Sequence, residues 1–155
     1  MVLLSGPEPQ RSLLEKKLLV ELKNYKGNIV IIRGKVESVQ KVKVENHMTI
    51  YNYMTTLELE KTINESQLVL SRSGYTTIMD LAKLEKKAFF IPTPGQYEQI
   101  YLAKKLHEDR IAPFCFQDDF SIEKLNDVKQ YNGFENSEKQ NPLDFNNLFS
   151  LFKCE

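Results

Sequence analysis

Short apolar runs alternate with helical segments along most of this chain, and this alternation limits the possible folds more than any other feature. Residues 28–33 place three isoleucines and a valine between turn residues, which is typical of a strand buried on both faces. Strands separated by helices imply right-handed βαβ units. The sequence therefore predicts an α/β fold with a doubly wound, mostly parallel sheet of six strands covered by helices on both faces. The expected strands are residues 2–4, 28–33, 47–51, 67–71, 87–91 and 112–116.

Apolar residues at helical spacing predict the segments between these strands. The leucines of residues 10–24 recur on one face, with charged residues on the other. Residues 34–46 alternate lysine with valine and are expected to be an exposed, charged excursion. The expected helices are residues 10–24, 55–64, 75–86, 96–108 and 121–131.

Length and charge narrow the class of protein. The 155 residues suffice for one domain, which we place at residues 1–130, and the polar residues 131–155 predict a linker with a C-terminal helix or tail. Lys plus Arg and Asp plus Glu each number 21, so no basic excess points to nucleic acid. A small molecule or a protein is the expected partner.

The cysteines bear on the cellular compartment of this chain, and the N-terminus bears on its domain organisation. Cys115 and Cys154 form neither a metal-binding spacing nor a disulfide framework, which favours a reducing cytoplasm. No apolar stretch reaches membrane-spanning length. A strand is expected immediately after Met1, as in a domain cut from a longer chain.

Two neighbouring strand-to-helix turns are the best candidates for a binding site. Residues 68–70 lead into a small-polar turn with Gly74 and then a helix. Residues 88–91 lead into a Pro/Gly turn and a helix that opens near Gln96. Helix N-termini offer free backbone N–H groups and a positive dipole end, which suit an anion such as phosphate.

These two turns carry a family resemblance. The segments Arg-Ser-Gly-Tyr-Thr-Thr-Ile-Met-Asp (72–80), Ile-Pro (91–92) and Glu-Gln-Ile-Tyr-Leu-Ala (98–103) resemble the C-terminal, donor-binding domain of GT-B glycosyltransferases of family 28. That group includes the lipid II N-acetylglucosaminyltransferase and the catalytic subunit of dolichol-linked chitobiose synthesis. The resemblance implies a Rossmann-like half of a GT-B fold that binds a nucleotide-sugar.

The resemblance also implies roles for individual residues. Gly74 and Thr77 would lie against the donor pyrophosphate, and Asp80 replaces the family's glutamate that binds both ribose hydroxyls. Gln99 would hold sugar hydroxyls, while Glu98 stands where relatives carry Gln or Asp. The neighbouring Ser73 and Thr76 complete the donor-binding residues expected in these two turns.

Two further segments match the family more loosely. The Ser5-Gly6 turn corresponds to the family's first Gly-rich loop, but Pro7 and Pro9 each remove an amide that could have met a phosphate. Tyr53 and Met54 lie where relatives enclose the uracil base. Each of these residues also has a plain structural explanation as a turn, first-turn, surface or core residue.

The implied function is metal-independent transfer of a hexosyl group from a UDP-sugar, UDP-N-acetylglucosamine being one candidate substrate, without a cofactor. The acceptor and the catalytic residues, which stay unknown, would come from a missing N-terminal domain in the same or another chain. The protein would then be cytoplasmic, or peripheral on the inner face of the membrane through that domain. Two alternatives stay open, namely half of a non-hydrolysing UDP-sugar epimerase and a non-catalytic doubly wound interaction domain.

Overall fold

The computed structural model describes residues 1–35 and 37–134, which contain one six-stranded sheet. The strand order is β3-β4-β2-β1-β5-β6, and every neighbouring pair is parallel except β3 with β4. This confirms the expected α/β class and the mostly parallel sheet. The strands are β1 (Val2–Leu3), β2 (Ile29–Ile32), β3 (Val42–Glu45), β4 (Met48–Tyr51), β5 (Val69–Ser71) and β6 (Ala88–Phe90).

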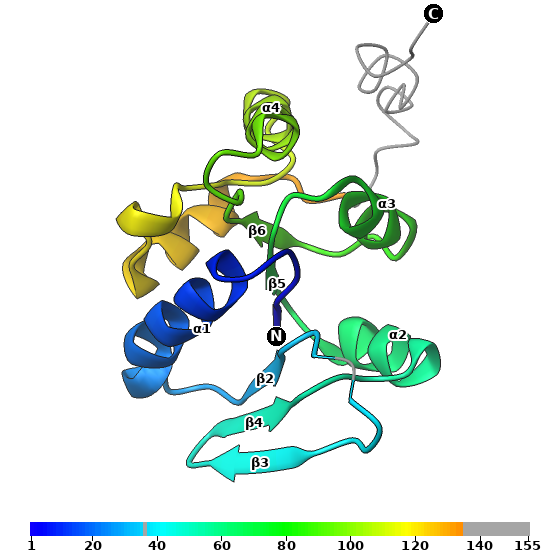
Figure 1. The fold of residues 1–155 in the computed structure, drawn as a ribbon. Helices are drawn as coiled ribbons and strands as arrows, with labels where there is room; N and C mark the ends of the chain where they lie inside the picture. Colours follow the sequence, from blue (N-terminus) through cyan, green and yellow to red (C-terminus); the bar gives the residue numbers. More distant parts are fainter. Residues whose placement is uncertain (36, 135–155) are drawn as a thin grey trace, which may run out of the picture.

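Helical segments cover both faces of the sheet (Figure 1). One core contains side chains of α1 and η3, and the other contains side chains of α2, α3 and α4. No helix among the described residues is long and apolar enough to cross a membrane. The helices are α1 (Gln10–Glu21), α2 (Thr56–Glu65), α3 (Tyr75–Lys83) and α4 (Tyr97–Glu108), and the 3-10 segments are η1 (Leu22–Asn24), η2 (Gln117–Asp119) and η3 (Ile122–Gln130).

The central strands alternate between the two cores because successive side chains of a strand point to opposite faces. Leu70 and Phe89 join the core under α1, whereas Val69, Ala88 and Phe90 join the core under α3 and α4. These strands have apolar residues on both faces, which is why they appear in the sequence as continuous apolar runs.

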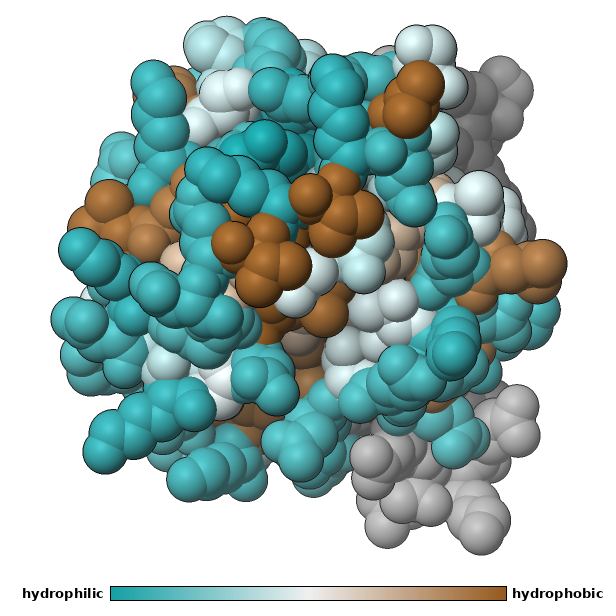
Figure 2. Space-filling model, turned by 90° about the horizontal axis from the view of Figure 1, so that it is seen from below, coloured by the Kyte–Doolittle hydropathy of each residue, from teal (hydrophilic) through white to brown (hydrophobic). Residues whose placement is uncertain are grey.

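The excursion expected at residues 34–46 contains a strand that was not predicted. β3 pairs antiparallel with β4 through a turn at Asn46, which has a φ of 53°. Val42 and Val44 remain 51% and 68% exposed, so the alternation with lysine does not mark a buried face. In Figure 1, β3 lies at the bottom of the molecule, and Figure 2 shows the molecule from that side. This surface is mostly hydrophilic, with a small apolar cluster near its middle.

The prediction of a strand at residues 112–116 was wrong. Phe114 makes only an isolated parallel bridge with Phe90, although Phe90 N donates to Pro113 O and Cys115 N to Phe90 O. Pro113 has no amide to donate, which limits the ladder to this one position. The sheet still has six strands because β3 supplies the sixth at the opposite edge.

Packed structure continues beyond residue 130. Tyr131 and Phe134 are buried, and Asn132 N and Gly133 N donate to Arg110 O and Ile111 O. The helix expected near 121–131 is the 3-10 segment η3. The expected linker and C-terminal helix after residue 134, with Cys154, lie outside the described residues.

The sheet reverses its winding direction between β1 and β5. The chain moves from β1 to β2 on one side, and from β5 to β6 on the other. The loops after β1 and β5 therefore meet at the carboxyl edge of the sheet. Ligands of open α/β sheets bind at such a switch point.

Candidate functional site

The N-terminus of α3 lies at this switch point and is open. Gly74 is its N-cap residue, with no side chain capping it and no acidic residue in the first turn. The first backbone hydrogen bond of the helix runs from Ile78 N to Gly74 O at 3.0 Å, so the amides of Thr76 and Thr77 donate to no helical carbonyl. This end of α3 can therefore receive an anion.

Each of the other three α-helices in the described part of the chain has a carboxylate at its start. Glu8 accepts hydrogen bonds from the backbone and hydroxyl of Ser12 before α1. Thr55 and Glu58 form a capping box on α2. Glu98 is in the first turn of α4. These carboxylates lower the capacity of α1, α2 and α4 to attract an anionic ligand.

Gly74 is a glycine that the backbone does not require. Its φ of −73° and ψ of 147° are allowed for any residue. A Cβ placed on Gly74 would meet no atom of the described residues within 4 Å. The missing side chain therefore leaves open space at the N-terminus of α3 without relieving any strain in the fold.

Three of the predicted donor-binding side chains share the first two turns of α3. Thr76 and Thr77 lie four and three residues before Asp80, spacings that bring side chains to one face of a helix. Thr76 and Asp80 are exposed and Thr77 is half-buried. A hydroxyl and a carboxylate can therefore face one ligand alongside the free amides.

Ser73 and Gln99, both predicted to bind the donor, join the two loops to each other. Ser73 is fully buried, and its hydroxyl donates to Gln99 O at 2.8 Å. The Gln99 side chain accepts from Thr93 N at 2.9 Å and donates to Gln96 Oε1 at 2.5 Å. In this structure these two side chains fix the loop geometry. The Gln99 amide keeps one N–H and one oxygen lone pair for another partner.

Arg72 extends this network beneath the site. Its guanidinium is fully buried and donates to Ile91 O and Pro92 O, to Gln10 O and to Gln117 Oε1, over 2.6 to 3.1 Å. Burial lowers the pKa of Arg72 to about 10, so the group is still charged at neutral pH. All four acceptors are neutral, and within residues 1–35 and 37–134 this buried positive charge has no carboxylate partner.

The remaining predicted residues occupy the edges of the site. Ser5 and Gly6 are exposed in the loop after β1, and Gly6 has a φ of 96°. Tyr53 and Met54 follow β4, where Tyr53 O accepts from Gln40 and the Met54 sulfur from the Thr62 hydroxyl. The α2 helix that they precede shares a core with α3, although two strands separate β4 from β5.

Sequence reasoning missed two polar residues here, Arg72 and Thr93. The family resemblance implies no role for Arg72, and Thr93 lies outside the segments that carry the resemblance. Thr93 is 2% exposed, and its Oγ1 has no hydrogen-bond partner among the described residues. A signal was present, since Thr93 stands between Pro92 and Pro94 at the end of a buried strand.

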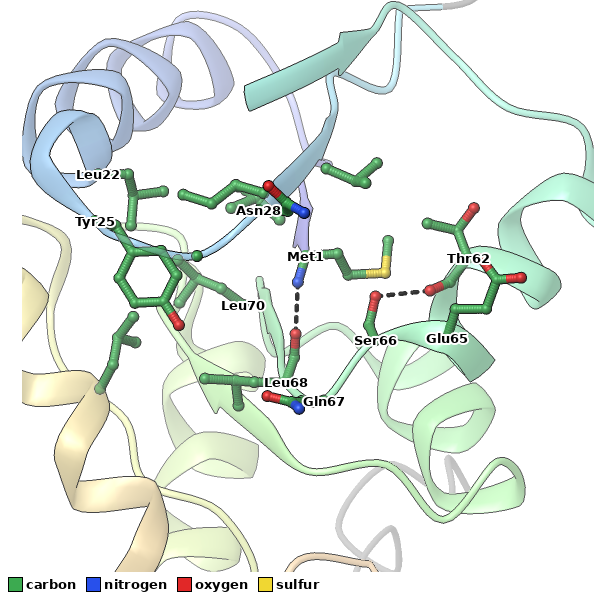
Figure 3. Close-up of a pocket in the computed structure, with 15 residues that line it drawn as sticks. Met1, Leu22, Tyr25, Asn28, Thr62, Glu65, Ser66, Gln67, Leu68 and Leu70 are labelled. Carbon is green, nitrogen blue, oxygen red and sulfur yellow. Dashed lines mark hydrogen bonds between the residues drawn. The ribbon is translucent and has the colours of Figure 1, made fainter. Parts of the chain in front are cut away.

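A cavity of about 610 Å³ lies at the opposite edge of the sheet. It is lined by the amino ends of β1, β2 and β5 with parts of α2, and Figure 3 shows Asn28, Thr62 and Gln67 around it. A hydrogen bond from Ser66 Oγ to Thr62 O fixes one wall. None of the predicted donor-binding residues lines this cavity, and the candidate site is therefore the loop edge.

No group of three or more His, Cys, Asp and Glu side chains suited to a metal ion occurs in residues 1–35 and 37–134. Cys115 is a free, buried thiol whose pKa is raised to about 11 by that burial. The polar groups at the loop edge include backbone amides, hydroxyls, the Asp80 and Glu98 carboxylates, the Gln99 amide and the buried Arg72 guanidinium.

Comparison with known proteins gives two curated relatives. One is a UDP-N-acetylglucosamine--N-acetylmuramyl-(pentapeptide) pyrophosphoryl-undecaprenol N-acetylglucosamine transferase from Rickettsia massiliae, 44% identical over 66 residues, covering 41% of this chain and 17% of the relative. A protein of the same name from Methylobacterium radiotolerans is 29% identical over 108 residues, covering 61% of this chain and 29% of the relative. The chain thus matches less than a third of either relative.

The family comparison covers much more of the chain. Residues 10–147 match the model of the glycosyltransferase family 28 C-terminal domain. The matched segment includes β2 to β6 and both turns of the candidate site. The chain belongs to the glycosyltransferase family 28 C-terminal domain family.

Proposed function

We propose that this chain is the donor-binding domain of a glycosyltransferase that takes a UDP-sugar and transfers its hexosyl group without a metal ion. The acceptor and the general base would come from an N-terminal domain in the same or another chain. The two curated relatives are named for UDP-N-acetylglucosamine, which makes this compound the first donor to test.

The observation that carries the proposal is the open N-terminus of α3 behind Gly74. A diphosphate placed there receives hydrogen bonds from backbone amides and from the Thr76 and Thr77 hydroxyls. The helix dipole and the buried Arg72 charge stabilise the negative charge that grows on UDP as the sugar departs. Protein groups thereby supply the stabilisation that a metal ion provides in other transferases.

Asp80 would bind the ribose in this arrangement. Its carboxylate can accept from two adjacent hydroxyls, and it lies one turn beyond the amides that would hold the phosphates. Tyr53 and Met54, in the loop before α2, would then border the base. Gln99 and Glu98 lie on the side of α4, where the sugar would extend.

Isothermal titration of the 155-residue chain with UDP and with UDP-N-acetylglucosamine tests the proposal. The chain should bind both, and Asp80→Ala should weaken UDP binding roughly tenfold or more, since hydrogen bonds to a charged group are lost. Asp80→Glu should retain binding. Asp127→Ala, which removes an exposed carboxylate of η3, is the matched control and should change nothing.

Two results would contradict the proposal. No binding of either compound at millimolar concentration would remove the donor assignment. Equal UDP affinity in Asp80→Ala and in the unchanged chain would remove the ribose assignment alone.

A further inference from the structure

The Thr93 hydroxyl is a buried polar group whose position the fold does not explain. Thr93 is 2% exposed, and its Oγ1 has no hydrogen-bond partner among the described residues. A buried hydroxyl without a partner lowers the stability of the folded state. A valine would fill the same volume without that cost, and the hydroxyl is therefore a candidate for binding something outside the fold.

The surrounding residues hold Thr93 in one position. Arg72 Nη1 donates to Pro92 O, on the residue before Thr93, at 3.0 Å. The Thr93 amide donates to Gln99 Oε1 at 2.9 Å. These two hydrogen bonds hold the peptide group before Thr93, and on its other side Thr93 O accepts from Gln96 N at 3.1 Å. The backbone that carries the hydroxyl is thus fixed before any ligand arrives.

Gly6 lies over this hydroxyl. With a φ of 96°, Gly6 presents its open side to Thr93, and a Cβ there would come within 3.7 Å of Oγ1 and of no other atom within 4 Å. Gly6 and Ser5 are exposed. The turn covers the hydroxyl, and contact with a ligand oxygen therefore requires this exposed turn to move.

The surrounding charge favours an anionic ligand. The Arg72 guanidinium is fully buried next to Thr93, and its four acceptors are all neutral. Among the groups named at this loop edge, Asp80 and Glu98 are exposed and Glu8 is engaged by Ser12 and Arg11. An anion beside Thr93 would therefore interact with a positive charge that is not already neutralised.

We propose that the Thr93 hydroxyl donates a hydrogen bond to the distal phosphate of the nucleoside diphosphate, with Arg72 and Gln99 as positioning residues. The proposal rests on the proposed function. The nucleoside lies towards Asp80 on α3, so the proximal phosphate meets the α3 amides. The chain of phosphates then runs towards the loop after β6, where Thr93 is.

Titration of Thr93→Val and Thr93→Ser with UMP, UDP and UDP-N-acetylglucosamine tests this contact. Thr93→Val should bind UDP and the UDP-sugar roughly tenfold more weakly, while UMP affinity stays unchanged. Its melting temperature should be unchanged or higher, because an unpartnered buried hydroxyl is removed. Thr93→Ser should retain UDP affinity, and Thr49→Val, a change in β4 away from the loops, should alter neither quantity.

The outcomes separate this inference from the proposed function. If the unchanged chain binds UDP and Thr93→Val binds it equally well, the phosphate contact is wrong and the donor site stands. Equal losses for UMP and UDP, or a loss for the UDP-sugar alone, also contradict a contact with the distal phosphate. If the unchanged chain binds neither UDP nor the UDP-sugar, the proposed function itself fails.

Discussion

The helices α1 and α3 follow adjacent parallel strands, and their first turns lie at the same edge of the sheet, the one formed by the carboxyl ends of the strands. The two helix N-termini differ in whether their amides are free to bind an anion. At α1 the Glu8 carboxylate already accepts from the Ser12 amide at 3.2 Å and the Ser12 hydroxyl at 2.9 Å, and it pairs with Arg11. At α3 Gly74 supplies no side chain, and the first turn has no acid. A helix N-terminus is therefore available to a ligand only where the protein has left it unfilled.

The glycines of the same edge show a similar contrast. Gly34 has a φ of 66°, and a Cβ there would lie 2.5 Å from Leu4 O, so the fold requires glycine. Gly74 has ordinary backbone angles and free space around it. A glycine that is not needed for folding is better explained by the close approach of a ligand.

The largest expected effect comes from Arg72, which connects the two regions by donating to Gln10 O in α1 and to Ile91 O and Pro92 O after β6. Arg72→Met removes the donor to the buried carbonyls of Ile91 and Pro92 and should lower the free energy of unfolding by about 3 kcal/mol or more. Arg72→Lys should lose less. Urea denaturation measures both, and a loss below about 1 kcal/mol would show that the loops do not depend on this network.

The two glycines should separate folding from binding. Gly74→Ala should leave the melting temperature unchanged but weaken UDP binding about tenfold, since the methyl group would occupy the open space at the N-terminus of α3. Gly34→Ala should lose more than about 1 kcal/mol of stability because of its positive φ and the clash with Leu4 O. Equal behaviour of the two variants in thermal unfolding and in titration would remove the distinction between them.

A smaller effect is expected for Glu8, whose side chain closes α1. The Ser12 hydroxyl, and then the Ser12 amide and Arg11, hold the pKa of Glu8 below its usual value. The resulting stability is present above the unfolded-state pKa and is lost as the pH falls through the lower folded-state value. Glu8→Gln should therefore melt slightly lower than the unchanged chain at pH 7, and the two should converge in acid.

UDP affinity is the second readout for Glu8→Gln. Because the α1 terminus is assigned no phosphate, the affinity should not fall. A clear loss of UDP binding in Glu8→Gln would mean that α1 takes part in the site.

The sequence allowed the buried part of the fold to be predicted, since β-branched runs such as residues 29–32 and the leucines of α1 follow the periods of strand and helix. The edge strand β3 was missed because Val42 and Val44 are exposed and leave no buried face for the pattern to reveal. The strand expected at residues 112–116 failed at Pro113, where the ladder lacks a donor.

The candidate site was predictable only where one segment contains it. Residues 72–80 carry the helix N-terminus and its glycine together, so they can be predicted as a candidate site from one segment. The link from Ser73 to Gln99 and the contacts of Arg72 with Gln10 and Gln117 join residues 26 to 62 positions apart. Only the folded sheet brings such partners together. The flanking prolines mark Thr93 in the sequence, but only the structure shows that its hydroxyl has no partner among the described residues.

Titration of the ¹⁵N-labelled chain with UDP, followed by the backbone amide resonances, tests the contrast between α1 and α3 most directly. The account predicts that the largest shifts fall on Gly74, Thr76 and Thr77, with little change at Ser12 and Leu13 in the first turn of α1. Shifts concentrated on α1, or spread without preference for α3, would contradict it.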